Sequence, residues 1–482
     1  MEIFGYVVIG IVGALLLFMI LRTVFTRPKK LETSDYVAQE INLEEVTAHL
    51  VGAIQYETIT MSDNSQDGSK FLAYQEYLES IYPLTMARAE KTLINKYAVI
   101  YKVKGSDESL LPVAVLAHQD VVPADEDGWE CEPFSGEIKD GYIYGRGSQD
   151  MKSQMIVALD GMETLLRSGK ELKRTVLFCF GHDEELRGTE GASRISEHLL
   201  SQGVRLEYVI DEGGTILDGS IIGINKKIAL IGTCEKGYAD FKLEVEKDGG
   251  HSSTPRRKTS VNTLVSAINR IEKHPVRPTW VKPVKDMFKA LAPYMNPAFK
   301  FVLVNRDIFS PILKPLLCLI SPFTNCLMRT TSATTQLKGA STPNTLPGVA
   351  SANVNCRINI DETVESTLAH LQKLAGKNVK ISIEEGYINP SPVSDIDSNA
   401  YAMLEKTIKE VYSEFLVAPY PFIAASDAKY YYKLTNNVYR FTPFEKTVED
   451  ANRIHGLNER IEIAQLVAGT RFFVRLFENT CC

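Results

Sequence analysis

Three short apolar segments between residues 113 and 214 constrain the fold more than any other feature of the chain. They read VAVLAHQD, TVLFCFGHDEE and LEYVIDEGG, and each closes on a cluster of ionisable side chains. Continuous runs of Val, Leu, Ile and Phe of this length are typical of strands buried on both faces. Helical patterns lie between them, so the sequence predicts repeated βαβ units and an α/β fold with a mostly parallel sheet flanked by helices.

The charged side chains fall at the carboxyl ends of these strands, where ligands bind in open α/β sheets. Imidazoles and carboxylates together suit borderline divalent cations such as zinc. Two adjacent metals that share one carboxylate would need about five ligands, and such a pair polarises a carbonyl and activates water. The predicted ligands are His118, Asp150, Glu185, Asp211 and His455.

Two further acidic residues stand beside these predicted ligands. Asp120 comes two residues after His118, so both can point the same way at a strand end, and Asp120 is predicted to orient the imidazole. Glu184 precedes Glu185, so the two side chains diverge and Glu184 is free to act as a general base. Each residue taken singly has a structural alternative, for example a helix cap at Asp150 or an ordinary histidine at position 455.

The N-terminus carries an uncharged run of 19 residues from Ile3 to Leu21, long enough to span a bilayer. No basic residue precedes it and no small-residue cleavage site follows it, so the sequence favours an uncleaved anchor over a signal peptide. Four basic residues follow the run, which by the positive-inside rule predicts a cytoplasmic catalytic part, with a secreted or extracytoplasmic location as the alternative. They are Arg22, Arg27, Lys29 and Lys30.

A chain of 482 residues exceeds one ordinary core, and its pattern changes near Gly237 to alternating strands around a helix at 260–273. We therefore expect a smaller α+β lid or dimerisation domain inserted into the first domain. The expected parts are an anchor at 1–25, a linker at 26–44, the catalytic domain at 45–236 and 359–482, and the insert at 237–358.

Residues 275–330 within the expected insert are rich in proline and apolar residues. Prolines and Lys314 interrupt the run, which argues against a second membrane span. The pattern leaves open whether this segment is a hydrophobic lid, a surface that touches the membrane, or buried core.

Charge and cysteine content exclude some classes of protein. The net charge is −7 with mixed signs, so no basic patch for nucleic acid is expected. The eight cysteines show no paired spacing, which favours a reducing compartment.

Several motifs resemble the aminoacylase/carboxypeptidase family of dinuclear zinc metallopeptidases, which includes carboxypeptidase S. They are LAHQDVVP, GWECEPFSGEIKDGYIYGRGSQDMK, GHDEELRGTEGA, DEGG, GHSSTP and RIHGLNERI. The segments DEGGTILD and SPFTNCLMRTTSATT are most similar to the branch of N-fatty-acyl-amino-acid synthase/hydrolases. The resemblance covers roughly residues 45–478.

The resemblance implies two zinc ions, one on His118 and Asp211, the other on Glu185 and His455, with Asp150 between them. It implies that Asp120 tunes His118, that Glu184 is the general base and acid, and that a cis peptide follows Asp150.

The resemblance also implies three residues that bind substrate: His251 for the developing oxyanion, and Asn344 and Arg357 for the free carboxylate. In relatives His251 often comes from the partner subunit, which implies a homodimer through the inserted domain. From the residues alone, GGHSSTP favours an ordinary polar turn over a catalytic role, whereas Asn344 in TPN fits a turn equally well.

We therefore expect a zinc-dependent hydrolase that cleaves the amide bond of N-acyl amino acids, fatty-acyl ones reversibly, or of small peptides with a free C-terminus. One alternative is a dipeptidase or carboxypeptidase without lipid preference. An alternative of another class is a non-catalytic, membrane-anchored binding protein on the same fold. The resembled branch is typically secreted after cleavage, whereas residues 3–21 predict a retained membrane anchor.

Overall fold

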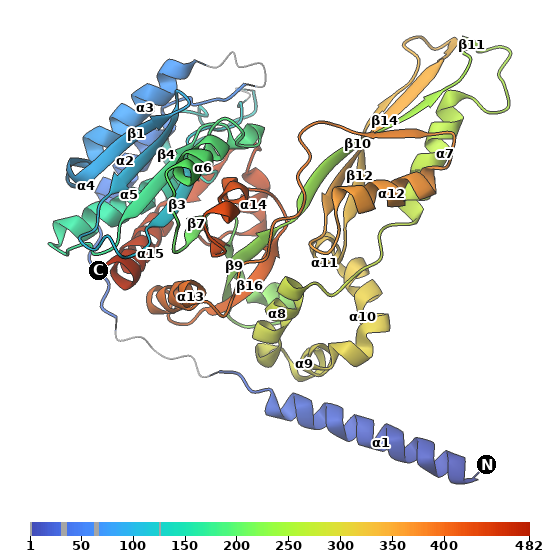
Figure 1. Ribbon diagram of the computed structural model, residues 1–482, viewed down its shortest axis with the longest axis horizontal. Helices are drawn as coiled ribbons and strands as arrows, with labels where there is room; N and C mark the ends of the chain where they lie inside the picture. Colours follow the sequence, from blue (N-terminus) through green and yellow to red (C-terminus); the bar gives the residue numbers. More distant parts are fainter. Residues whose placement is uncertain (1, 30–35, 62–66, 125–126) are drawn as a thin grey trace.

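The computed structural model describes residues 2–29, 36–61, 67–124 and 127–482 (Figure 1). Its main sheet has the strand order β1-β2-β6-β3-β7-β17-β9-β16, and β8 pairs with β9. The strands are β1 Ala89–Ile94, β2 Ala98–Val103, β3 Val113–His118, β6 Val176–Gly181, β7 Val209–Asp211, β8 Thr215–Asp218, β9 Lys227–Glu235, β16 Leu416–Phe422 and β17 Val438–Arg440.

The three apolar segments singled out above are β3, β6 and β7, which lie side by side. β3 pairs in parallel with β6 and with β7, so their carboxyl ends meet at one edge. β17 is parallel to β7 and β16 to β9, while β1–β2, β2–β6, β8–β9 and β17–β9 are antiparallel, so the sheet is mixed. The α/β fold is confirmed.

Helices cover both faces of this sheet. Alternate residues of β3 face opposite layers: Val113 and Val115 join the core under α2, α5 and α15, whereas Ala114 and Leu116 join the core under α6. The helices are α2 Leu43–Ile54, α3 Gly68–Ile81, α4 Pro83–Arg88, α5 Lys152–Arg167, α6 Ala192–Ser201, α13 Asn399–Val411 and α15 Ile463–Cys481.

Helix α5 is buried along almost its whole length because it packs against α15, α2, α4 and the strand β3. Gly161 lies at the crossing, where a Cβ atom would stand only 2.7 Å from the Cβ of Phe473. A glycine is therefore required for the two helices to approach this closely, and α5 begins two residues after Asp150.

A second sheet, with the order β12-β14-β10-β15, forms a smaller domain that α7 and α12 cover. Its elements are β10 Gly237–Glu246, α7 Ser260–Lys273, β12 Thr331–Lys338, β14 Val349–Ile358, α12 Val364–Ala375 and β15 Lys380–Ile383. The expected insert ended at residue 358, but β15 pairs with β10 and α12 packs in this core. The sheet therefore continues beyond that boundary.

Residues 282–328 form four helices that pack on the main sheet and not in the core of the small domain. They are α8 Lys282–Leu291, α9 Pro297–Val304, α10 Arg306–Ile320 and α11 Pro322–Met328. Val284, Leu313 and Leu317 share a core with Leu416 and Ala418 of β16. Leu316 and Leu319 point outward and are exposed, so this segment is part core and part apolar surface.

Helix α1, Glu2–Phe25, extends away from the rest of the protein (Figure 1). The segment Ile3–Phe25 is long and apolar enough to cross a membrane. Among the described residues, no other helix meets both conditions. The predicted linker includes residues 30–35, and Lys30 with them, which lie outside the described residues.

Candidate active site

His118 stands at the end of β3, buried, with both ring nitrogens in contact with acidic residues. Nδ1 lies 2.8 Å from the main-chain oxygen of Asp120 and 3.4 Å from its carboxylate. Nε2 lies 3.0 Å from Oδ1 of Asp150 and 3.6 Å from Oε1 of Glu212. The ring is thus oriented by Asp120, and Nε2 faces the carboxylates.

Asp150 is held in place by Glu459, which is completely buried. One Glu459 oxygen accepts hydrogen bonds from the main-chain N–H groups of Gln149 (2.8 Å) and Asp150 (3.2 Å). Its other oxygen accepts a 2.6 Å bond from Arg146, whose guanidinium also donates to the Gly456 carbonyl. This network ties the Asp150 loop to the loop of His455, and the peptide after Asp150 is cis.

Glu184 and Glu185 open a short 3₁₀ helix, Glu184–Leu186, directly beyond β6. The carboxylate of Asp120 accepts the main-chain N–H groups of both, at 3.2 and 3.1 Å, and so positions the pair. Glu185 lies 3.1 Å from Nε2 of His455, which in turn lies 3.1 Å from the second oxygen of Asp150. Asp150 therefore stands between the two imidazoles.

Asp211 does not face this cluster. Its carboxylate is buried at the end of β7 and accepts a 2.7 Å hydrogen bond from the main-chain N–H of Ala428. The next residue, Glu212, reaches His118 instead and forms a group of possible ligands with Glu184. Glu212, and not the predicted ligand Asp211, therefore stands beside His118, because adjacent residues at a strand end point in different directions.

Burial and mutual repulsion perturb the acidic groups of the site. Burial raises the pKa of Glu184 well above its usual range. Burial and the nearby Asp150 raise the pKa of Glu212 to about 7. Hydrogen bonds to Asp150 and Glu185 raise the pKa of His455 to about 10. Buried carboxylates crowded in this way favour a cation among them.

The donor atoms fit metal ions. His118 with Asp150 and Glu185, and His118 with Glu184 and Glu212, each bring their ligand atoms within 4.8 Å of one another. Nitrogen and carboxylate donors of this kind are typical of zinc and related divalent metals. The residues that would hold the metals are His118, Asp150, Glu185, Glu212 and His455.

The three predicted substrate residues all lie on the small domain. His251 ends β11, Gly250–His251, at the tip of that domain (Figure 1), where its ring contacts Ser253. Asn344 directly precedes β13, Thr345–Leu346, which pairs with β11. Arg357 lies on β14, with its guanidinium 4.9 Å from the ring centre of Tyr238.

Besides Glu212, sequence reasoning missed Glu459 and Lys429. Glu459 belongs to the quoted motif RIHGLNERI, but an acid after His455 has no spacing that marks it as a partner of Asp150. Lys429 follows β16, and although burial would lower its pKa, the nearby Glu184 and Asp427 raise it. Lys429 therefore places a positive charge beside the predicted general base.

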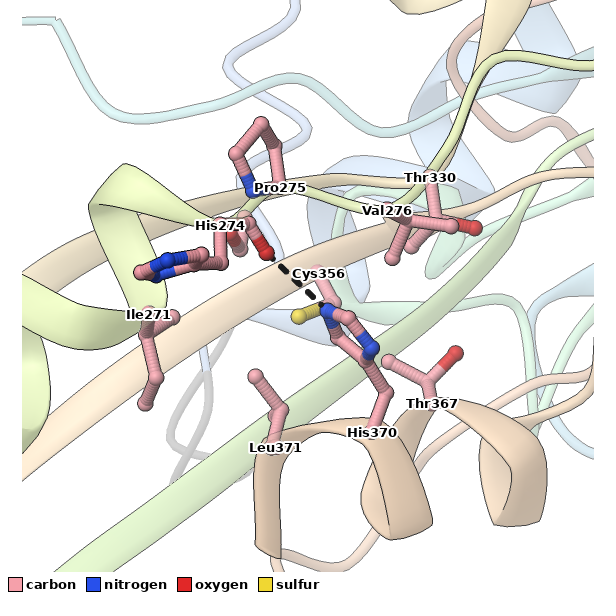
Figure 2. Close-up of a pocket in the computed structure, with 10 residues that line it drawn as sticks. Ile271, His274, Pro275, Val276, Thr330, Cys356, Thr367, His370 and Leu371 are labelled. Carbon is pink, nitrogen blue, oxygen red and sulfur yellow. Dashed lines mark hydrogen bonds between the residues drawn. The ribbon is translucent and has the colours of Figure 1, made fainter. Parts of the chain in front are cut away.

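A separate small cavity lies in the small domain, between α7, α12 and the sheet. Figure 2 shows His274, Cys356 and His370 in its lining, with His370 3.1 Å from the His274 carbonyl oxygen. Its volume of about 10 Å³ suits one water molecule. It has no acidic residue in its lining and plays no part in the site described above.

The α/β sheet and the cluster at its strand ends define the protein as a metal-dependent hydrolase. The chain belongs to peptidase family M20/M25/M40, whose model matches residues 114–479.

Two relatives illustrate the similarity. The N-fatty-acyl-amino acid synthase/hydrolase PM20D1 of Xenopus tropicalis is 38% identical over 442 residues, which cover 91% of this chain and 86% of the relative. The probable carboxypeptidase S-like 2 of Dictyostelium discoideum is 33% identical over 479 residues, covering 97% and 92%.

Solved structures share the fold. The M20 family metallo-carboxypeptidase Sso-CP2 of Sulfolobus solfataricus superposes with a TM-score of 0.67 at 18% identity, over 90% of this chain and 98% of that one. The Bacillus subtilis YXEP protein, a dinuclear metal binding peptidase of the M20 family, gives a TM-score of 0.55 at 14% identity, over 90% and 98%.

Proposed function

We propose that this protein is a zinc-dependent hydrolase of N-acyl amino acids, with fatty-acyl substrates preferred and the reaction reversible. The observation that carries the proposal is the convergence of His118, Asp150, Glu185, Glu212 and His455, with Glu184 free beside them. The name of the 38% identical relative supports the N-fatty-acyl substrate class. The carboxypeptidase S-like relative supports the second candidate, a peptidase without lipid preference.

The ligands divide between two metal positions. His118 and Glu212 would hold one ion, Glu185 and His455 the other, and Asp150 would bridge them. When bound, such a pair polarises the amide carbonyl and makes water a better nucleophile. Asp120 and Glu459 keep the ligands in place through the hydrogen bonds described above.

Glu184 moves the proton. Its carboxylate takes a proton from the attacking water and passes it to the leaving nitrogen. Burial raises the pKa of Glu184, which makes its carboxylate a stronger base. Lys429 beside it favours the charged form and so opposes part of that shift.

A second subunit completes the site. His251 and Asn344 lie at the exposed tip of the small domain, away from the cluster of their own subunit. We infer a homodimer through the small domain, in which the partner subunit's His251 stabilises the oxyanion. Asn344 and Arg357 would bind the free carboxylate, since arginine pairs with a carboxylate through two hydrogen bonds.

We propose that the small domain comprises its four-stranded sheet with α7 and α12, and that residues 282–328 belong with the catalytic domain, on whose sheet they pack. Residues 3–25 would anchor the protein in a membrane, and the basic residues Arg22, Arg27 and Lys29 support a cytoplasmic location of the catalytic part.

The neighbouring residues Glu184 and Glu185 provide a matched test. We expect Glu184→Gln to keep its metal and lose about two to four orders of magnitude in turnover, because only the proton transfer is removed. Glu185→Gln should lose metal as well. Metal analysis beside rates on a panel of N-acyl amino acids and dipeptides decides the matter. Near-normal activity of Glu184→Gln contradicts the assignment, and equal rates on acetyl and long-chain substrates favour the general peptidase.

A further inference from the structure

The outer side of α10 and the start of α11 form an apolar surface without a protein partner among the described residues. Leu313 and Leu317 on the inner side are buried in the core. The outer side chains recur at helical spacing, and Ile312 and Leu319 are 71% and 81% exposed. The α10 face, as we call it, consists of Ile308, Ile312, Leu316, Leu319, Ile320 and Phe323.

This face is unusually apolar for a surface in water. Between residues 308 and 323 the only charged residue is Lys314. The exposed prolines at positions 311, 315 and 322 extend the apolar area. Contiguous exposed apolar patches of this kind mark contacts with a protein or a membrane.

The C-terminal end of α1 docks directly beside the α10 face. The side-chain N–H groups of Asn305, which is fully buried, donate to the Met19 carbonyl at 3.3 Å and to the Thr23 hydroxyl at 3.0 Å. Between Met19 and Thr23 in the sequence, Arg22 approaches Asp307, two residues after Asn305, at 3.5 Å. The residues that hold α1 therefore immediately precede Ile308, the first residue of the face.

These contacts place the face at the level where α1 would leave a bilayer. Residues 3–18 of α1 have no buried side chain, whereas Met19 is buried against the protein. Arg22, Arg27 and Lys29 follow within a few residues, as is typical of the headgroup region. The Lys29 carbonyl accepts a 3.0 Å hydrogen bond from Tyr294, so this basic stretch also stays close to α8 and α9.

We propose that the α10 face inserts into the lipid leaflet through which α1 leaves the membrane. The occupant of this surface is then the bilayer itself, because a helix that can span the bilayer is fixed beside it by a buried asparagine. Helices with one apolar side lie in the interface in this way. The inference rests on the membrane anchor of the proposed function and is independent of the hydrolysis.

Tryptophan fluorescence in vesicles tests this proposal with the full-length protein. The chain has two native tryptophans, so the parent protein supplies the background. Leu319→Trp places a probe on the α10 face, and Leu93→Trp is the matched control. Leu93 is also exposed, at 47%, but lies on β1 at the opposite end of the main sheet. The vesicles contain phosphatidylcholine with brominated acyl chains, which quench indoles that enter the hydrocarbon.

We expect quenching above the parent background for Leu319→Trp and none for Leu93→Trp. Equal behaviour of the two variants overturns the proposal, as does full-length protein that does not sediment with the vesicles. If Leu319→Trp is dimeric and its tryptophan emission is blue-shifted but not quenched, the proposal is also overturned, and the α10 face is assigned to a second copy of the chain. Ile312→Trp replaces Leu319→Trp if that variant fails to fold. Hydrolysis of a soluble short-chain substrate, measured on the same samples, reports separately on the proposed function.

Discussion

Glu212 and Asp211 are adjacent carboxylates, and the structure predicts opposite consequences for their conversion to amides. Glu212 lies 3.6 Å from Nε2 of His118, among the predicted metal ligands. Asp211 points away and accepts the main-chain N–H of Ala428 at 2.7 Å. Glu212→Gln should therefore weaken metal binding, whereas Asp211→Asn should keep the metal because an amide oxygen can still accept that hydrogen bond.

The expected loss of metal affinity is large. Substitution of a residue behind a ligand typically costs 10–100-fold in affinity, so loss of a ligand should cost at least about 100-fold. Dialysis against graded chelator followed by metal analysis gives the number of ions per chain. We expect Glu212→Gln to lose one ion at chelator concentrations where Asp211→Asn and the parent lose none.

The stability of the metal-free protein provides a second test, in which Glu212→Gln should have a favourable effect although it weakens metal binding. Burial raises the pKa of Glu212 from about 4.5 to about 7, so its proton is held more tightly in the folded chain. The contribution of Glu212 to the free energy of unfolding therefore falls as the pH rises from about 4.5 to about 7. Each pKa unit corresponds to about 1.4 kcal/mol, and since the side chain is 19% exposed we discount the total to about 2 kcal/mol.

At pH 8 the metal-free Glu212→Gln protein should then unfold at a higher temperature than the metal-free parent, although it binds metal less well. Thermal unfolding after chelator treatment measures this shift. The reasoning is refuted if Asp211→Asn loses the metal while Glu212→Gln retains it, since Asp211 would then be the ligand that the sequence suggested.

Three further predictions follow from contacts outside the ligands themselves. Glu459→Gln should weaken metal binding about 10–100-fold, because Glu459 fixes the main chain at Asp150. Added metal should partly restore the hydrolysis rate of this variant, and unchanged resistance to chelator would contradict the role. Burial lowers the pKa of Lys236 to about 8, below its value in the unfolded chain, so the unfolded chain binds more protons between about pH 8 and 10. The free energy of unfolding should thus rise across that interval by about 1 kcal/mol per pH unit relative to Lys236→Met, as denaturant titrations at several pH values can show. Gly161→Ala should lower the melting temperature, because forcing α5 and α15 apart costs about 1–3 kcal/mol. The gain in helix propensity offsets at most about 1 kcal/mol of that cost. An unchanged melting temperature would mean that the two helices separate without cost.

The sequence by itself determined the elements and the edge of the sheet at which the chemistry gathers. The helix expected at 260–273 has those bounds in the structure, and the three apolar segments are neighbouring strands. Hydrophobic periodicity and helix-capping residues act within a few residues, so these features are readable along the chain. The carboxyl ends of parallel neighbours then meet by necessity, which brings the charged residues after β3, β6 and β7 together.

Only the tertiary structure decided which of two adjacent residues faces the site and where distant segments pack. The choice between Asp211 and Glu212 depends on contacts with Ala428 and His118, which come from other parts of the chain. The inclusion of β15 in the small sheet depends on its pairing with β10, more than a hundred residues earlier. Leu316 and Leu317 are neighbours of equal hydrophobicity, yet one is exposed and the other is core, because α10 presents only one side to β16. Local pattern cannot encode such choices, since each is settled by the residues that the fold brings opposite.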